Sequence, residues 1–130
     1  MKNGIVAGAV AGIIAGIVGV LYIITMYGYW PIDLSNPWWL MQIGVNIVWG
    51  GIFGFMYQMF HDSIPGKGVV KGVVFGFLIW LVHAIYPFTF IMIFWAQEPS
   101  VTAFGNSMVV GGIIVRVIAY GISIGYLFKK

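Results

Sequence analysis

Two side chains that carry or can acquire a positive charge, Arg116 and His83, lie deep within long apolar stretches of the sequence. A cation at the centre of a membrane-spanning helix costs about 2.5 to 3.5 kcal/mol, so such a residue is a candidate for a functional site. The three acidic residues, Asp33, Asp62 and Glu98, lie in or beside the polar connections between these stretches. Arg116 therefore has no acidic counter-ion within the apolar segments.

Three ways of satisfying Arg116 follow: neutral acceptors within the protein, an anionic group on a ligand or lipid, or a carboxylate from another subunit. The neutral acceptors that the sequence offers, besides freed backbone carbonyls, are Gln42, Asn46, Asn106 and Tyr120. Asn46 lies near the middle of its apolar stretch, and Tyr120 lies one helical turn after Arg116. We predict an intramembrane polar site formed by Arg116, His83, Asn46 and Tyr120.

Pro87 follows His83 by four residues. Because proline has no N–H to donate to the carbonyl of His83, we expect a helix kink at this place. The His83 imidazole is expected to stay neutral, since a neighbouring arginine and burial both disfavour its protonation. No metal, haem or other cofactor and no enzymatic activity are expected, because the chain lacks cysteine and two histidines supply too few ligands.

The segments that position these residues are strongly apolar. The 130 residues are 62% hydrophobic and 7% charged, and their mean hydropathy is +1.03, whereas soluble domains carry about 25% charged residues. Residues 4–29, 38–60, 68–95 and 102–128 each form an apolar stretch long enough to cross a hydrocarbon core of about 30 Å. The sequence thus predicts an all-α fold, a polytopic four-helix transmembrane bundle that occupies residues 1–130 as a single domain. Soluble enzymes, nucleic-acid binders and disulfide scaffolds are excluded.

Charge predicts the orientation of the bundle. If the chain crosses four times, two acidic residues, Asp33 and Glu98, fall on one side. All the lysines fall on the other side: Lys2, Lys67, Lys71, Lys129 and Lys130. By the positive-inside rule, we expect a multi-pass protein of the inner (plasma) membrane with both termini in the cytoplasm.

Nineteen glycines are expected to serve helix packing. Each costs roughly 1 kcal/mol against alanine in a water-exposed helix, whereas in lipid small residues let two backbones approach closely. The predicted packing positions are Gly4, Gly8, Gly12, Gly16, Gly72, Gly76 and Gly112. Two interpretations stay open: these faces pack within one bundle, or some of them also bind another chain in a homo- or hetero-oligomer.

Residues 4–8 (GIVAG) are similar to residues 72–76 (GVVFG), and Pro37 and Pro99 precede paired glycines by nearly equal distances. A duplication would relate two hairpins as parallel repeats about an axis along the membrane normal. Glycine-rich composition alone would produce the same similarity, so both explanations stay open.

Residues 50–57 (GGIFGFMY), 64–72 (IPGKGVVKG) and 75–81 (FGFLIWL) together resemble small, uncharacterised prokaryotic four-span inner-membrane proteins of the YagU-like kind. The resemblance covers about the central third of the chain. It implies a compact inner-membrane bundle of prokaryotic origin, and it brings no catalytic residues with it.

The leading functional hypothesis is a non-enzymatic accessory or scaffolding subunit of a larger membrane complex, assembled through glycine-rich helix packing. The alternative is a small oligomeric transporter or permeation element with an intramembrane Arg116/His83 site. A third hypothesis is a binding site for an anionic amphiphile or a quinone near these two residues.

Overall fold

The computed structural model describes residues 1–27, 35, 37–95 and 114–130, with side chains for all of these except Tyr27 and residues 83–95. This part of the chain is all-helical. It consists of α1 (Gly4–Tyr27), α2 (Trp38–Phe60), the 3-10 turn η1 (His61–Ser63), α3 (Gly68–Trp95) and α5 (Ile114–Leu127). The predicted helical class is confirmed for these ranges, and α2 and α3 have the predicted bounds. Residues 28, 29 and 102–113 of the predicted first and fourth stretches lie outside the described residues.

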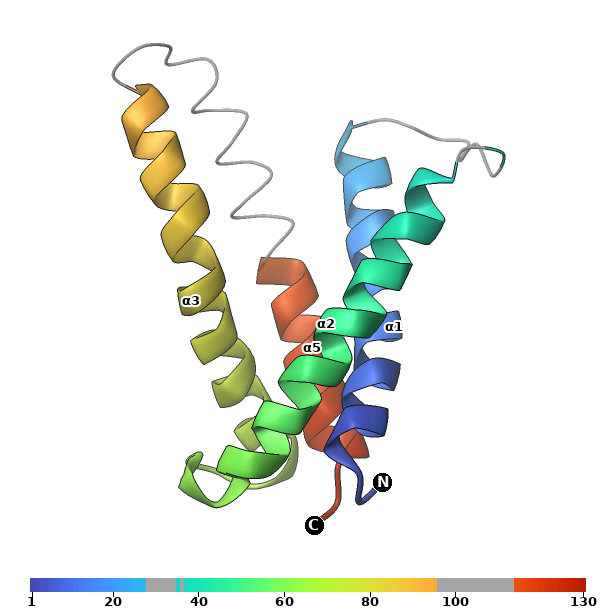
Figure 1. Ribbon diagram of the computed structural model, residues 1–130, viewed down its shortest axis with the longest axis vertical. Coiled ribbons are helices and arrows are strands. Elements are labelled where there is room, and N and C mark those ends of the chain that lie inside the picture. The colour runs from blue at the N-terminus through green and yellow to red at the C-terminus, as the bar shows by residue number, and fades with distance from the viewer. Residues whose placement is uncertain (28–34, 36, 96–113) are drawn as a thin grey trace.

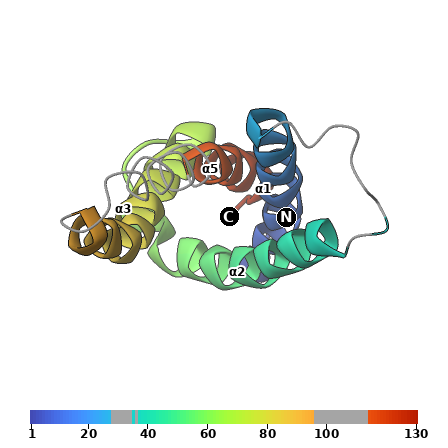
Figure 2. The ribbon, with the colours of Figure 1, turned by 90° about the horizontal axis from the view of Figure 1, so that it is seen from above.

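The helices are not arranged in their order along the chain. The three main interfaces are α1 with α2, α1 with α5, and α3 with α5, so the order in space is α2, α1, α5, α3. Seen from above, α5 lies between α3 and α1, and α2 lies across the interior from α5 (Figure 2). Both termini lie at one end of the molecule, here called the terminal end, and α2 and α3 diverge from it toward the far end (Figure 1).

The α1–α2 interface is a seam of backbone against backbone. A β-carbon built on Gly8 would overlap the carbonyl oxygen of Gly50 and lie 2.6 Å from the Cα of Gly54. At Gly12 it would overlap the carbonyl oxygen of Asn46. Only glycine allows such an approach, which brings Cα–H groups against carbonyl oxygens. The α1 glycines of this seam are Gly4, Gly8, Gly12 and Gly16.

A second seam joins α3 to α5. A β-carbon on Gly72 would overlap the carbonyl oxygen of Gly121 and lie 2.6 Å from the Cα of Gly125. On Gly76 it would lie 2.8 Å from the carbonyl oxygen of Val117. The predicted packing role of Gly72 and Gly76 therefore has a defined partner helix, α5. Gly112 lies outside the described residues.

Alanines form the other small-residue face of α1. Ala7, Ala11 and Ala15 are at most 2% exposed and belong to one hydrophobic core with Tyr120 and Ile124 of α5. Since the glycine face meets α2 and the alanine face is buried in this core, both small-residue faces of α1 are used within the chain.

The terminal end is closed by a group of rings, here called the basal cluster: Tyr57, His61, Phe75 and Phe128. Tyr57 is 1% exposed and its ring centroid lies 5.1 Å from that of Phe75, which joins α2 to α3. The buried Lys71 donates a hydrogen bond of 2.5 Å to the carbonyl oxygen of His61, which ends α2. A lysine at this place satisfies a carbonyl that the helix itself leaves free.

An N-cap residue and two glycines determine where α1 and α3 begin at this end. The side chain of Asn3 accepts hydrogen bonds from the backbone N–H groups of Ile5 and Val6, as an N-cap residue does. The turn into α3 contains Gly66 at φ +97° and Gly68 at φ +51°, conformations that glycine adopts without steric cost.

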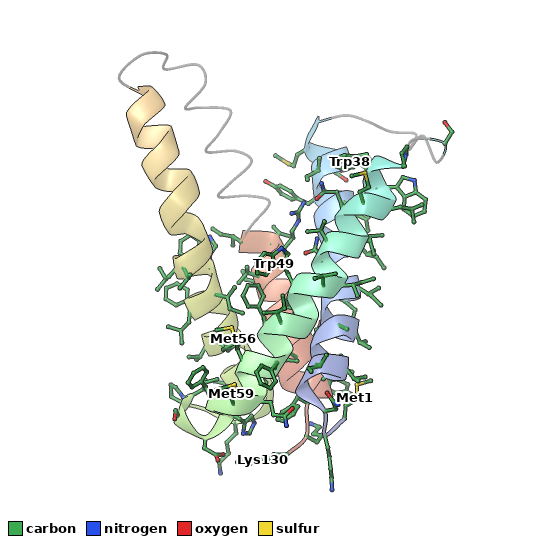
Figure 3. The ribbon with its side chains drawn as sticks, in the orientation of Figure 1. Met1, Trp38, Trp49, Met56, Met59 and Lys130 are labelled. Carbon is green, nitrogen blue, oxygen red and sulfur yellow. The ribbon has the colours of Figure 1, made fainter. Side chains whose placement is uncertain are left out.

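Two helical segments, Gly4–Met26 and Trp38–Ser63, are long and apolar enough to cross a membrane. The apolar segments Gly68–Val82 and Ile114–Leu127 are shorter within the described residues. Large apolar side chains cover the outer surface of the helices, among them Met41, Val48 and Val82, which are 65%, 63% and 71% exposed. Figure 3 shows the side chains that the helices carry.

Candidate functional site

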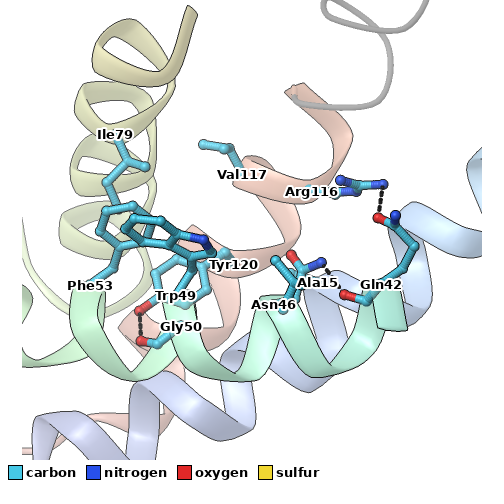
Figure 4. A pocket seen from close by; sticks show the side chains of 11 residues that line it. Ala15, Gln42, Asn46, Trp49, Gly50, Phe53, Ile79, Arg116, Val117 and Tyr120 are labelled. Carbon is cyan, nitrogen blue, oxygen red and sulfur yellow. Dashed lines mark hydrogen bonds between the residues drawn. The ribbon is translucent and has the colours of Figure 1, made fainter. Parts of the chain in front are cut away.

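A cavity of about 210 Å³ lies between the diverging helices, above the basal cluster. All four α-helices of the described residues contribute to it, and most of its wall is apolar or aromatic (Figure 4). The residues that line it are Ala15, Gln42, Val45, Asn46, Trp49, Gly50, Phe53, Ile79, Arg116, Val117 and Tyr120. Three of the four residues predicted to form a polar site thus line one cavity.

Arg116 is the cationic member of this wall. Its Nη2 donates a hydrogen bond of 3.3 Å to Oε1 of Gln42, while its buried Nε has no hydrogen-bond partner. Within the described residues no carboxylate pairs with it, since Asp62 pairs with Lys130 at the terminal end. A guanidinium has five N–H donors, so a single long bond to a neutral amide leaves most of its donor capacity unused.

The Arg116 side chain packs against Gly19 of α1. A β-carbon built on Gly19 would overlap Nε of Arg116 and lie 2.7 Å from its Cγ and 2.8 Å from its Cδ. The arginine side chain therefore lies directly against the α1 backbone and fills the space that a β-carbon at Gly19 would need. The close approach aims the guanidinium at Gln42 on the neighbouring helix.

The Arg116 side chain extends along α2 toward the far end. Gln42 and Gly50 are about 12 Å apart along α2, whereas Arg116 and Tyr120 are about 6 Å apart along α5, at 1.5 Å per residue. Arg116 bonds to Gln42 and Tyr120 bonds to Gly50, so the side chains bridge the difference. The long side chain of Arg116 thus reaches the level of Gln42, about one turn after Trp38, where α2 begins.

Asn46 does not pair with Arg116, contrary to the simplest form of the prediction. Its Nδ2 donates a hydrogen bond of 2.7 Å to the backbone carbonyl oxygen of Gln42, one turn earlier in α2. Gln42 therefore contacts both polar residues, through its side chain on one side and its backbone on the other (Figure 4). Gln42 and Asn46 lie one turn apart on the same face of α2, so the level that the arginine side chain reaches along α2, which the sequence does not fix, makes Gln42 its partner.

Tyr120 anchors the opposite end of the cavity. Its hydroxyl donates a buried hydrogen bond of 2.8 Å to the carbonyl oxygen of Gly50, while Arg116 donates to Gln42 and not to Tyr120, which the sequence offered as an acceptor. Trp49 and Phe53 stack with ring centroids 5.6 Å apart, and Phe53 meets the Tyr120 ring edge to face at 6.4 Å. Together these rings form an aromatic wall.

The remaining predicted residues lie beyond what the structure describes in side-chain detail. α3 continues through His83 and Pro87 to Trp95 as one helix, but the side chains of His83 and Pro87 are outside the described residues. Their assignment to the polar site and to a kink stays a prediction.

Gly19, Trp49 and Phe53 were not predicted as site residues. Gly19 continues the series Ala7, Ala11, Ala15 at a spacing of four, and this spacing indicates that it lies on the side of α1 that faces α5. Trp49 and Phe53 are also four residues apart, so their stacking on one face of α2 could be inferred from spacing alone.

The cavity thus has a polar end and an aromatic end. At the polar end a guanidinium and two amides offer hydrogen bonds, and at the other end rings and aliphatic groups offer apolar contact. In the ranges with described side chains, no three histidine or acidic residues gather to hold a metal ion. The chemistry that this arrangement supports is recognition of an anion attached to an apolar group.

No protein-family model, no curated protein and no solved structure matches the chain. The resemblance to YagU-like inner-membrane proteins therefore stays a prediction.

Proposed function

We propose that the chain is a four-span, multi-pass protein of the inner membrane with both termini in the cytoplasm. Two helices meet the length and hydropathy requirements for spanning, and large apolar side chains face outward along the bundle. Contiguous exposed apolar surface of this extent is suited to lipid rather than to water. The ion pair between Lys130 and Asp62 ties the lysine-bearing C-terminus to the α2–α3 connection, which fits one positively charged cytoplasmic end.

Within this membrane protein, the cavity binds the headgroup of an anionic amphiphile taken from the bilayer. The observation that carries this proposal is the state of Arg116: a guanidinium on the wall of a largely apolar cavity, held by one neutral acceptor and with a buried Nε that has no partner. An anion would supply the acceptor oxygens that the described residues lack. Charge-assisted hydrogen bonds of this kind are about twice as strong as neutral ones.

The size of the cavity favours an amphiphile over a fully enclosed solute. Its volume of about 210 Å³ is below the range of about 300–1,000 Å³ that is usual for small-molecule pockets. A headgroup fits inside, while an acyl chain must remain outside. Val45 and Trp49 on the cavity wall are about half exposed (52% and 48%), so the acyl chain of the lipid has an apolar exit toward the surrounding bilayer.

The hypotheses of an accessory subunit and of a permeation element stay predictions. The first depends on small-residue faces left over for a partner, and the α1 faces are already covered by α2 and by the α5-containing core. Gly44 of α2, where a β-carbon would meet no atom within 4 Å, is one outward-facing position that such a partner could use. The second depends on His83, whose side chain the structure leaves undescribed.

The test is lipid retention by the purified protein. The protein is exchanged in mild detergent into mixed micelles that contain phosphatidylglycerol or zwitterionic phosphatidylcholine, and bound lipid is counted by native mass spectrometry. We expect the wild-type protein to retain phosphatidylglycerol in preference to phosphatidylcholine. In Arg116→Gln we expect anionic-lipid retention to fall at least about tenfold, because a charge-assisted contact is worth about 1.5–3 kcal/mol.

Lys67→Gln is the matched control, since it removes one positive charge from an exposed position away from the cavity. Its lipid retention should equal that of the wild type. Equal loss in both variants would show attraction by net charge alone and would overturn the proposal. Unchanged retention in a folded Arg116→Gln protein would overturn it as well.

A further inference from the structure

The polar end of the cavity offers a hydrogen-bond acceptor as well as donors. Because Nδ2 of Asn46 donates to the carbonyl oxygen of Gln42, its Oδ1 is the part of the amide left for a ligand. No hydrogen bond to this oxygen is made by another described residue, and Asn46 lines the cavity. In Figure 4 its oxygen points away from the Gln42 carbonyl, toward the cavity.

Gln42 holds the donor and the acceptor beside each other. Its side-chain Oε1 binds the guanidinium of Arg116, and its backbone carbonyl fixes the amide of Asn46. A headgroup that enters this end therefore meets guanidinium N–H groups, which need an anionic oxygen, next to an amide oxygen, which needs a hydrogen-bond donor. Satisfying only the first would leave the amide oxygen without a partner in an apolar setting, which is costly.

We infer that the headgroup bound at Arg116 carries a hydroxyl beside its anionic group, and that Asn46 recognises this hydroxyl. The inference rests on the proposed function and names its ligand class: an anionic phosphodiester lipid with a hydroxylated headgroup, as in phosphatidylglycerol. The donor is a hydroxyl rather than an ammonium group because an ammonium would lie close to the Arg116 cation, and like charges in a medium of low polarity repel strongly.

The experiment compares two lipids of equal charge. Phosphatidylglycerol and phosphatidylmethanol are both phosphodiesters with one negative charge, but only the first has headgroup hydroxyls. The wild-type protein in mixed micelles is offered both lipids with matched acyl chains, and the bound ratio is measured by native mass spectrometry. We expect phosphatidylglycerol to be favoured about fivefold, the preference that one neutral hydrogen bond supplies.

Variants then assign the preference to its residue. In Asn46→Ala the two lipids should be retained equally, while total retention of anionic lipid over phosphatidylcholine persists. Val48→Ala, an exposed apolar residue of α2 outside the cavity wall, should keep the wild-type preference. A preference that survives in Asn46→Ala would overturn the assignment. The wild-type comparison needs no variant, so it decides the inference even if Asn46→Ala does not fold.

The outcomes separate this inference from the proposed function. If the wild-type protein retains phosphatidylglycerol and phosphatidylmethanol equally, and both over phosphatidylcholine, the hydroxyl inference is overturned and anion binding stands. If it retains neither anionic lipid over phosphatidylcholine, the proposed function itself is overturned.

Discussion

Gly8→Ala tests the α1–α2 seam on which the position of the cavity depends. The added methyl group would overlap the carbonyl oxygen of Gly50 and lie 2.6 Å from the Cα of Gly54, where ordinary van der Waals contact begins at 3.4 Å. Both obstacles are backbone atoms, so no change of rotamer relieves the overlap. The two helices must move apart by about 1 Å, which opens the packed seam to either side.

The magnitude follows from two opposing terms. Overpacking costs about 1–3 kcal/mol, and the upper end applies here because the backbone cannot step aside. The exchange of glycine for alanine in a helix returns about 1 kcal/mol. Gly44→Ala, on α2, gains the helix-propensity term of about 1 kcal/mol without any overpacking, since its β-carbon meets no atom within 4 Å. The difference between the two variants therefore isolates the overpacking term, and we expect about 3 kcal/mol.

The assay is reversible unfolding in mixed micelles of mild detergent and SDS, followed by far-UV circular dichroism. We expect Gly44→Ala to unfold at or above the SDS fraction of the wild type and Gly8→Ala well below it. Equal midpoints for Gly8→Ala and Gly44→Ala would refute the close seam, and with it the helix arrangement that forms the cavity.

Three further predictions concern the cavity and the terminal end. Gly19→Ala forces the Arg116 side chain to move and breaks its hydrogen bond to Gln42, which is already 3.3 Å long. Because the guanidinium then leaves its place on the cavity wall, anionic-lipid retention measured by native mass spectrometry should fall about tenfold, with the SDS midpoint little changed. Lys71→Met leaves the carbonyl of His61 without its donor and should cost about 1–3 kcal/mol in the SDS titration. Tyr120→Phe removes one buried hydrogen bond and should cost about 1 kcal/mol in the same titration.

Each of these has a contradicting result. Full lipid retention in Gly19→Ala would show that lipid binding by Arg116 does not depend on its packing against Gly19. An SDS midpoint for Lys71→Met equal to that of the exposed-site control Lys67→Met would show that the buried ammonium does not cap α2. A wild-type midpoint for Tyr120→Phe would show that its hydroxyl bond contributes nothing net.

The helices follow from the sequence because apolar length and breaker residues determine them. Proline and polar residues bound α2 and α3, and those bounds were predicted correctly. The packing role of Gly8 and Gly72 was also predictable, since glycine at a spacing of four leaves a flat face that another helix can approach. Which helix uses that face was not, because the order α2, α1, α5, α3 is a property of all four helices together.

The sequence predicted which residues line the cavity better than it predicted the hydrogen bonds among them. Arg116, Asn46 and Tyr120 do share one cavity, because a cation and amides in apolar stretches must face protein. Their partners differ from the simplest expectation: Gln42 takes the guanidinium, and Tyr120 donates to a backbone carbonyl. The axial level of each helix against its neighbours decides such partners, and hydropathy carries no information about it. The buried, capping role of Lys71 was missed for the same reason, since its charge indicated only orientation.

The spatial order of the helices has a consequence for biosynthesis. α1 and α2 can pack together as soon as both have been synthesised. α3 forms no seam with either of them, and its seam partner among the described helices is α5, which is translated last. In the membrane topology proposed above, the Gly72 face of α3 would be exposed to insertases and membrane proteases during that interval. Ribosome stalling or truncation before residue 114 should therefore yield a stable N-terminal hairpin and a rapidly degraded third helix.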